Sequence, residues 1–116
     1  MGHYDSESYG LAWKARGLCT NLTNLEIFDT IGVTGNIIGS EIHHNYFGHY
    51  SYGHDGGNWT GNHVHDNFGY GFDPHDDSDD LIIHNNHVHN NGWHGIIASK
   101  RCNNVSIVGN HVHDNG

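Results

Sequence analysis

The sequence of 116 residues is poor in alanine, in basic residues and in proline. Alanine occurs three times, whereas glycine occurs 17 times and asparagine 15 times. Because glycine and asparagine rank low in helix propensity, this composition excludes a helical bundle. No apolar run approaches the roughly 20 residues that a membrane crossing needs, so we expect no membrane partner.

Positive charge is also scarce, with four Lys and Arg against 13 Asp and Glu and a formal net charge of -9. This balance argues against a basic nucleic-acid-binding surface, so we expect no nucleic-acid partner. One of the two pairs of basic residues is Lys100 and Arg101. The two cysteines, Cys19 and Cys102, match no zinc or redox spacing, which leaves their pairing open.

A period of 24 residues organises the second half of the chain. The tetrapeptide Asn-His-Val-His begins at Asn62, Asn86 and Asn110. The same spacing relates a second set of asparagines, namely Asn67, Asn91 and Asn115. Within each copy, short alternating apolar groups are separated by Gly, Asn and Asp, which predicts short strands joined by turns. A repeat of this length made of strands fits one coil of a parallel β-helix.

We therefore predict an all-β, right-handed parallel β-helix of about four coils of roughly 24 residues. Residues 1–116 would form one partial domain, with an irregular coil at 1–35 that carries an insertion and regular coils at 36–116. Residues 24 apart would become neighbours about 4.8 Å apart, so Asn91 and its repeats would form an asparagine ladder. Neither end offers a capping unit, so we expect a fragment that does not fold well alone.

Two clusters could hold metals, although a plainer interpretation is favoured for both. Three His-x-His pairs flank Val64, Val88 and Val112, which places the valines inward and the imidazoles outside one sheet. Imidazole can ligate zinc or copper, but we favour a repeated surface strand and predict no metal site. The acidic run 76–80 could bind calcium; we favour a solvated turn and predict no cofactor.

The only proline, Pro74, lies where one copy breaks the apolar pattern of the repeat. The following coil reads Ile96-Ile97-Ala98-Ser99, whereas this coil reads Phe72-Asp73-Pro74-His75. Such a local departure is expected at functional sites. Asp73 and His75 would project from the same face of a strand, where the carboxylate can orient the imidazole and raise its basicity. An Asp-Pro turn with a solvated histidine is the alternative.

Lys100 and Arg101 would supply positive charge one coil from His75. In the 24-residue register they lie over Asp76 and Asp77, where they could also form a surface ion pair between coils. Strict strand alternation would direct Arg101 to the His75 face. A strand that ends at the preceding serine removes that constraint, so both residues remain candidates.

The segment Tyr70-Gly71-Phe72-Asp73-Pro74-His75-Asp76 resembles a motif of the mannuronan C5-epimerases, enzymes that remodel alginate. One coil later, His94-Gly95-Ile96-Ile97-Ala98-Ser99-Lys100 resembles the second motif of that family. Trp93 before this segment and Arg101-Cys102-Asn103 after it are more similar to the brown-algal members than to the bacterial periplasmic ones.

The resemblance implies a β-helix with an alginate groove that inverts β-D-mannuronate at C5 to α-L-guluronate within the polymer. By analogy, His75 takes the C5 proton beside Asp73, and Tyr70 or a water returns a proton from the opposite face. Lys100 corresponds to the family's arginine that neutralises the substrate carboxylate, with Arg101 as an alternative, and His94 joins the binding residues. The resemblance also implies a secreted, extracellular or cell-wall protein that acts as a monomer.

Two other functions fit the same residues. An alginate lyase shares the first step, removal of the C5 proton, and then expels the O4 substituent. A non-catalytic β-helix that binds polysaccharide or forms wall structure would remove no proton. Deuterium incorporation at C5 and the presence of unsaturated chain ends separate the three functions.

Overall fold

In the computed structural model, the described part of the chain contains strands and turns and no helix. The structure describes residues 21–23, 26–27, 36–53 and 55–116. The strands are β1 (Asn21–Thr23), β2 (Glu26–Ile27), β3 (Asn36–Ile38), β4 (Glu41–His43), β5 (His49–Tyr52), β6 (Asp55–Thr60), β7 (His63–His65), β8 (Phe72–His75), β9 (Asp79–His84), β10 (His87–His89), β11 (Asn103–Val108) and β12 (His111–His113). No described segment is a helix long and apolar enough for a membrane crossing.

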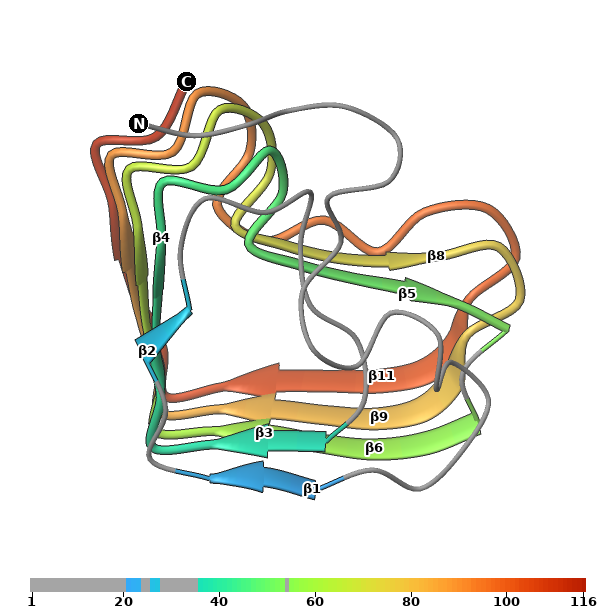
Figure 1. Cartoon of the computed structure of the whole chain (residues 1–116). Coiled ribbons are helices and arrows are strands. Elements are labelled where there is room, and N and C mark those ends of the chain that lie inside the picture. Colours follow the sequence, from blue (N-terminus) through green and yellow to red (C-terminus); the bar gives the residue numbers. More distant parts are fainter. Residues whose placement is uncertain (1–20, 24–25, 28–35, 54) are drawn as a thin grey trace.

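The strands form three parallel sheets that are the sides of a coil (Figure 1). One sheet has the order β1-β3-β6-β9-β11, the second β12-β10-β7-β4-β2, and the third pairs β5 with β8. A bridge from Phe72 to Ile96 continues the third sheet into the next coil. From residue 36 onward, each of the two longer sheets contains four levels. This architecture confirms the predicted parallel solenoid of about four coils.

The register between coils follows the sequence repeat in the later coils and departs from it earlier. His63 pairs with His87 and His87 with His111, each 24 residues apart as predicted. The preceding coil is shorter, because Glu41 pairs with His63, at a spacing of 22 residues. Of the predicted irregular coil at 1–35, only β1 and β2 are described, and they pair with β3 and β4; the rest lies outside the described residues.

The core is a single apolar cluster between the three sheets. Its members are at most 1% exposed and are Ile37, Ile42, Trp59, Val64, Phe72, Leu81, Ile83 and Val88. Val64 and Val88 point inward between half-buried histidines, as the alternation predicted. Burial of each such side chain contributes about 1.5–3 kcal/mol, so stacking of coils provides the main driving force.

Asparagine ladders at two corners tie each coil to the next. The predicted ladder is present: the side-chain nitrogen of Asn67 donates to Asn91 Oδ1 at 2.9 Å, and that of Asn91 donates to Asn115 Oδ1 at 2.9 Å. A second ladder joins Asn62, Asn86 and Asn110 in the same way. Both ladders satisfy buried backbone groups as well, which is the requirement for polar residues inside a protein.

Candidate functional site

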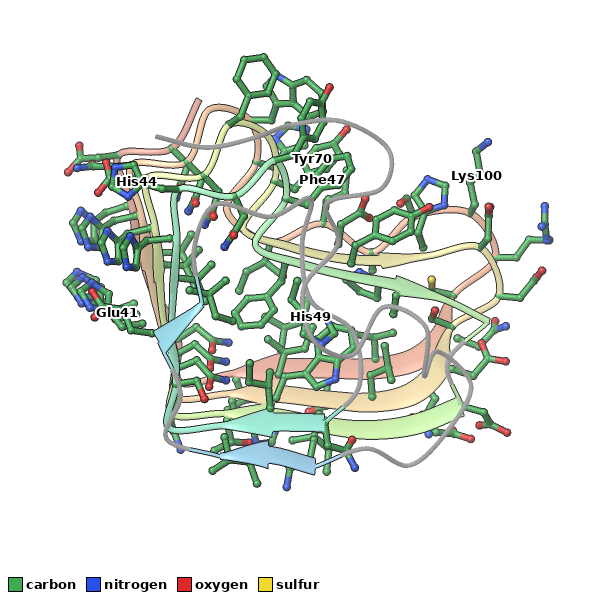
Figure 2. All side chains as sticks on the ribbon, in the orientation of Figure 1. Glu41, His44, Phe47, His49, Tyr70 and Lys100 are labelled. Carbon is green, nitrogen blue, oxygen red and sulfur yellow. The ribbon has the colours of Figure 1, made fainter. Side chains whose placement is uncertain are left out.

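The outer face of the β5–β8 sheet carries the residues that broke the repeat pattern. Phe72 of β8 is fully buried and stacks on Trp59 in the core. Because side chains alternate along a strand, Asp73 and His75 both point to the opposite, outer side of the sheet. Figure 2 shows His49 inside the coil, whereas Phe47, Tyr70 and Lys100 lie outside β5 and β8. Strand β8 therefore directs Asp73 and His75 to the outer side of this sheet.

Asp73 is a buried carboxyl group with one oxygen engaged. The residue is 1% exposed, and its Oδ1 accepts a hydrogen bond from Ser99 Oγ of the next coil at 3.0 Å. Oδ2 is buried and has no hydrogen-bond partner among the described residues. Burial raises the pKa of Asp73, while the Ser99 hydrogen bond and the nearby charge of His75 oppose the rise. The hydrogen bond of the Asp73 side chain therefore runs to Ser99 of the next coil and not to His75.

His75 is held between a carboxylate and an aromatic ring. Its Nδ1 is buried and lies 3.2 Å from Asp76 Oδ2, an ion-pair distance without hydrogen-bond geometry. Its ring stacks on that of Tyr50, with centroids 5.5 Å apart and planes at 30°. The side chain is 22% exposed. Because Nδ1 faces the protein, Nε2 is the ring nitrogen that a substrate can reach.

The corner after β8 separates the two candidate cations. Asp76, Asp77, Lys100 and Arg101 all have φ between 36° and 64°, so strand alternation stops at His75. Arg101 forms the predicted ion pair between coils, with Nε 2.7 Å from Asp77 Oδ1 and a terminal nitrogen 3.1 Å from Oδ2. That hydrogen-bonded pair lowers the pKa of Asp77. Arg101 is therefore occupied by a carboxylate of its own protein.

Lys100 is exposed at the same corner. Its carbonyl oxygen accepts the Asp77 N–H at 2.9 Å, which fixes its backbone one coil above the acidic pair. Within the part of the chain that the structure describes, its ammonium forms no ion pair, and Figure 2 shows the side chain directed away from the coil. Of the two predicted cations, Arg101 is thus engaged by Asp77 and also lies 4.0 Å from Asp76 Oδ1, whereas Lys100 extends into solvent.

A line of rings connects the two ends of the site, and we call it the aromatic row. Its members in order are His94, Tyr70, Phe47, Tyr50 and His75. Neighbouring centroids along it are 5.4 to 5.8 Å apart. Tyr70 and His94 are stacked as the 24-residue register implies, but Phe47 and Tyr50 stand between Tyr70 and His75. The structure therefore brings His75 together with Tyr50 and not with Tyr70.

A shallow hollow of about 390 Å³ lies at the Tyr70 end of the aromatic row. Its lining consists of Tyr70, Gly92, Trp93, His94 and Gly116. The Trp93 ring meets Tyr70 edge-on, with centroids 5.0 Å apart.

Two residues of the site were missed from the sequence. Tyr50 pairs with Asp73 across β5 and β8 at a spacing of 23 residues, so the 24-residue register does not reveal it. Ser99 aligns with His75 in the repeat, yet its hydroxyl reaches Asp73, 26 residues earlier. Aligning the coil that contains β5 with the coil that contains β8, with a gap of one residue, would have placed Tyr50 beside Asp73.

The acidic run 76–80 also contributes contacts between coils. Asp79 Oδ1 accepts the backbone N–H of Asn103 at 2.8 Å, and Asp80 Oδ1 accepts a hydrogen bond from Asn104 Nδ2 at 2.7 Å. These carboxylates thus bond to the next coil, whereas the sequence suggested a solvated turn.

Comparison with known proteins agrees with this architecture. The model of a family described as a right handed beta helix region matches residues 18–116, which include every described strand. No curated protein and no solved structure matches the chain.

Proposed function

Because the chain belongs to the right-handed β-helix family, which includes carbohydrate-active enzymes, we propose that it acts on alginate as a mannuronan C5-epimerase. The observation that supports this most directly is the arrangement outside the β5–β8 sheet. There, His75 has one reachable ring nitrogen beside the buried Asp73, and Lys100 lies unpaired among the described residues on the adjacent coil. An imidazole and a cation at neighbouring levels suit a uronate ring that touches both.

The chemistry balances without any redox partner. Neutral His75 takes the C5 proton through Nε2, the C5–H bond breaks, and its electron pair moves into the carboxylate, which gains a second negative charge. Lys100 stabilises that charge as it develops, which is often the largest catalytic contribution. A proton returned to the opposite face of C5 gives the guluronate. Tyr50 and Tyr70 are the two phenols of the aromatic row that could donate it.

The aromatic row gives the polymer a path across the sheet. A chain that enters at the Tyr70 hollow passes over Phe47 and Tyr50 before it reaches His75. The net charge of -9 opposes a polyanion at long range, but salt screens exposed charges beyond about 8–10 Å. The local charge of Lys100 can therefore dominate binding, with alginate outside the cell as the proposed partner.

Incubation of the chain with polymannuronate in D2O tests the proposal. Proton NMR should show guluronate signals with deuterium at C5 and no shortening of the polymer. Unsaturated ends that absorb ultraviolet light would instead identify a lyase. Binding of the polymer without any C5 deuterium would overturn catalysis and leave a polysaccharide-binding β-helix.

Replacing Lys100 and replacing Arg101 should have different effects on epimerase activity. Lys100→Met is expected to lower kcat/KM for polymannuronate about 100-fold, because it removes charge stabilisation from the developing dianion. Arg101→Met should leave activity within about threefold of the unmodified chain and barely move the urea midpoint, since its ion pair is exposed. NMR time courses and urea titrations of both variants measure this. A larger loss for Arg101→Met would reverse the assignment.

A further inference from the structure

Two columns of imidazoles cover a different face of the solenoid, outside the β4–β7–β10–β12 sheet. One column contains His63, His87 and His111, and the other contains His65, His89 and His113. Within each column, successive rings are nearly parallel, for example His63 on His87 at 4.9 Å and 6°. Glu41 lies in the preceding coil and pairs with His63. Figure 2 shows Glu41 on the opposite side of the molecule from Lys100. This face is therefore separate from the aromatic row.

The columns are joined diagonally through ring nitrogens. Nε2 of His63 lies 2.8 Å from Nε2 of His89, and Nε2 of His87 lies 2.8 Å from Nε2 of His113. Two nitrogens at right angles around an ion, as in square-planar Cu²⁺ and Ni²⁺ sites, are about 2.8–3.0 Å apart at bonds of 2.0–2.1 Å, whereas tetrahedral zinc needs about 3.3–3.4 Å. The ligand nitrogens of His63, His87 and His89 all lie within 4.8 Å of one another. Parallel strand pairing thus gathers three imidazoles closely enough for a rotation of one ring to bring all three to a single ion.

We propose that His63, His87 and His89 bind one divalent transition-metal ion, of the copper, nickel or zinc type. Imidazole is a ligand that these metals prefer, whereas calcium and magnesium prefer oxygen. The ion would enter between the two Nε2 atoms of the diagonal pair, and a rotation of the partly exposed His87 ring supplies the third bond. On this proposal, the repeated surface strand that the structure shows also carries a metal site.

The surroundings favour this triad over its neighbours. Burial, together with repulsion from adjacent imidazoles, lowers the pKa of His63 and of His87, and neutral imidazole is the form that ligates metals. His65 is already engaged by carboxylates, with Glu41 Oε2 at 2.7 Å and Asp66 Oδ2 at 2.6 Å. A second triad of His87, His111 and His113 shares His87, so both triads cannot be filled with three ligands each at once.

Titration of the 116-residue chain with Cu²⁺, Ni²⁺ and Zn²⁺ tests the site. The protein should carry no histidine tag and should be treated with a chelator beforehand. Calorimetry is expected to show one tight ion per chain, tightest for Cu²⁺, with no binding of Ca²⁺. Imidazole nitrogen NMR shifts should change for His63, His87 and His89. Failure of all three metals to bind below millimolar concentration, in a chain whose circular dichroism spectrum shows β-structure, would overturn the proposal.

Paired variants locate the ion on this face. His87→Gln removes the ligand shared by both triads and should weaken binding at least about 10- to 100-fold. His84→Gln is the matched control, because His84 lies on β9 and its Nε2 bonds to Ser106 Oγ at 2.8 Å. Circular dichroism checks that both variants keep the fold. Equal weakening in the two variants, or none in His87→Gln, would show that the ion binds elsewhere. Neither readout depends on epimerase activity, so this test stands apart from the proposed function.

Discussion

Replacing His75 by glutamine is expected to lower the rate of C5 deuterium exchange in polymannuronate about 10²–10⁴-fold. A positioned general base typically contributes a factor of this order, and glutamine keeps the size of the side chain without the basic nitrogen. Single-turnover NMR in D2O measures the exchange directly. Affinity for the polymer should change little, because Lys100 and the aromatic row are retained.

A histidine outside the site provides the control for this prediction. His84→Gln changes the same residue type on β9, where its ring bonds to Ser106. This variant should exchange deuterium at the unmodified rate. If His75→Gln retained more than a tenth of the rate while keeping its fold, another group would have to be the base.

The stacking of the coils was predictable because it depends only on the spacing of residues. Once Asn67, Asn91 and Asn115 repeat every 24 residues, parallel pairing must place them above one another, and the hydrogen bonds between their amides follow. The same logic placed Val64 and Val88 inside the coil. Asp73 and His75 were likewise predicted on one face of a strand, which the pairing of β8 with β5 supports.

The corners were not predictable in the same way. Lys100 and Arg101 have φ values of 54° and 64°. Residues other than glycine, asparagine and aspartate rarely adopt a positive φ. The sequence therefore left the positions of the two cations open, and the structure shows that Arg101 is paired with Asp77. The 22-residue spacing between β4 and β7 and the 23-residue spacing between β5 and β8 shift Tyr50 out of the repeat. Contacts between coils of unequal length cannot be predicted from the spacing of residues in the sequence and require the structure.

Removing one rung of the buried asparagine ladder should have the largest effect on stability. Asn91 is 3% exposed, and its Oδ1 accepts hydrogen bonds from both the backbone and the side-chain nitrogen of Asn67. Its own Nδ2 donates to Val64 O and to Asn115 Oδ1. Asn91→Ala leaves several of these groups without partners, at about 1–3 kcal/mol each. We expect a loss of about 3–5 kcal/mol in the free energy of unfolding, measured by urea titration.

The control is an asparagine on the surface. Asn58 of β6 is exposed. Among the described residues, its side-chain oxygen accepts one hydrogen bond, which comes from the Thr60 hydroxyl. Asn58→Ala should therefore cost less than about 1 kcal/mol. Because small domains are stable by only about 5–15 kcal/mol, Asn91→Ala would approach the limit of folding while Asn58→Ala would not. Equal costs would mean that the strand hydrogen bonds and the apolar core hold the coils together without the ladders.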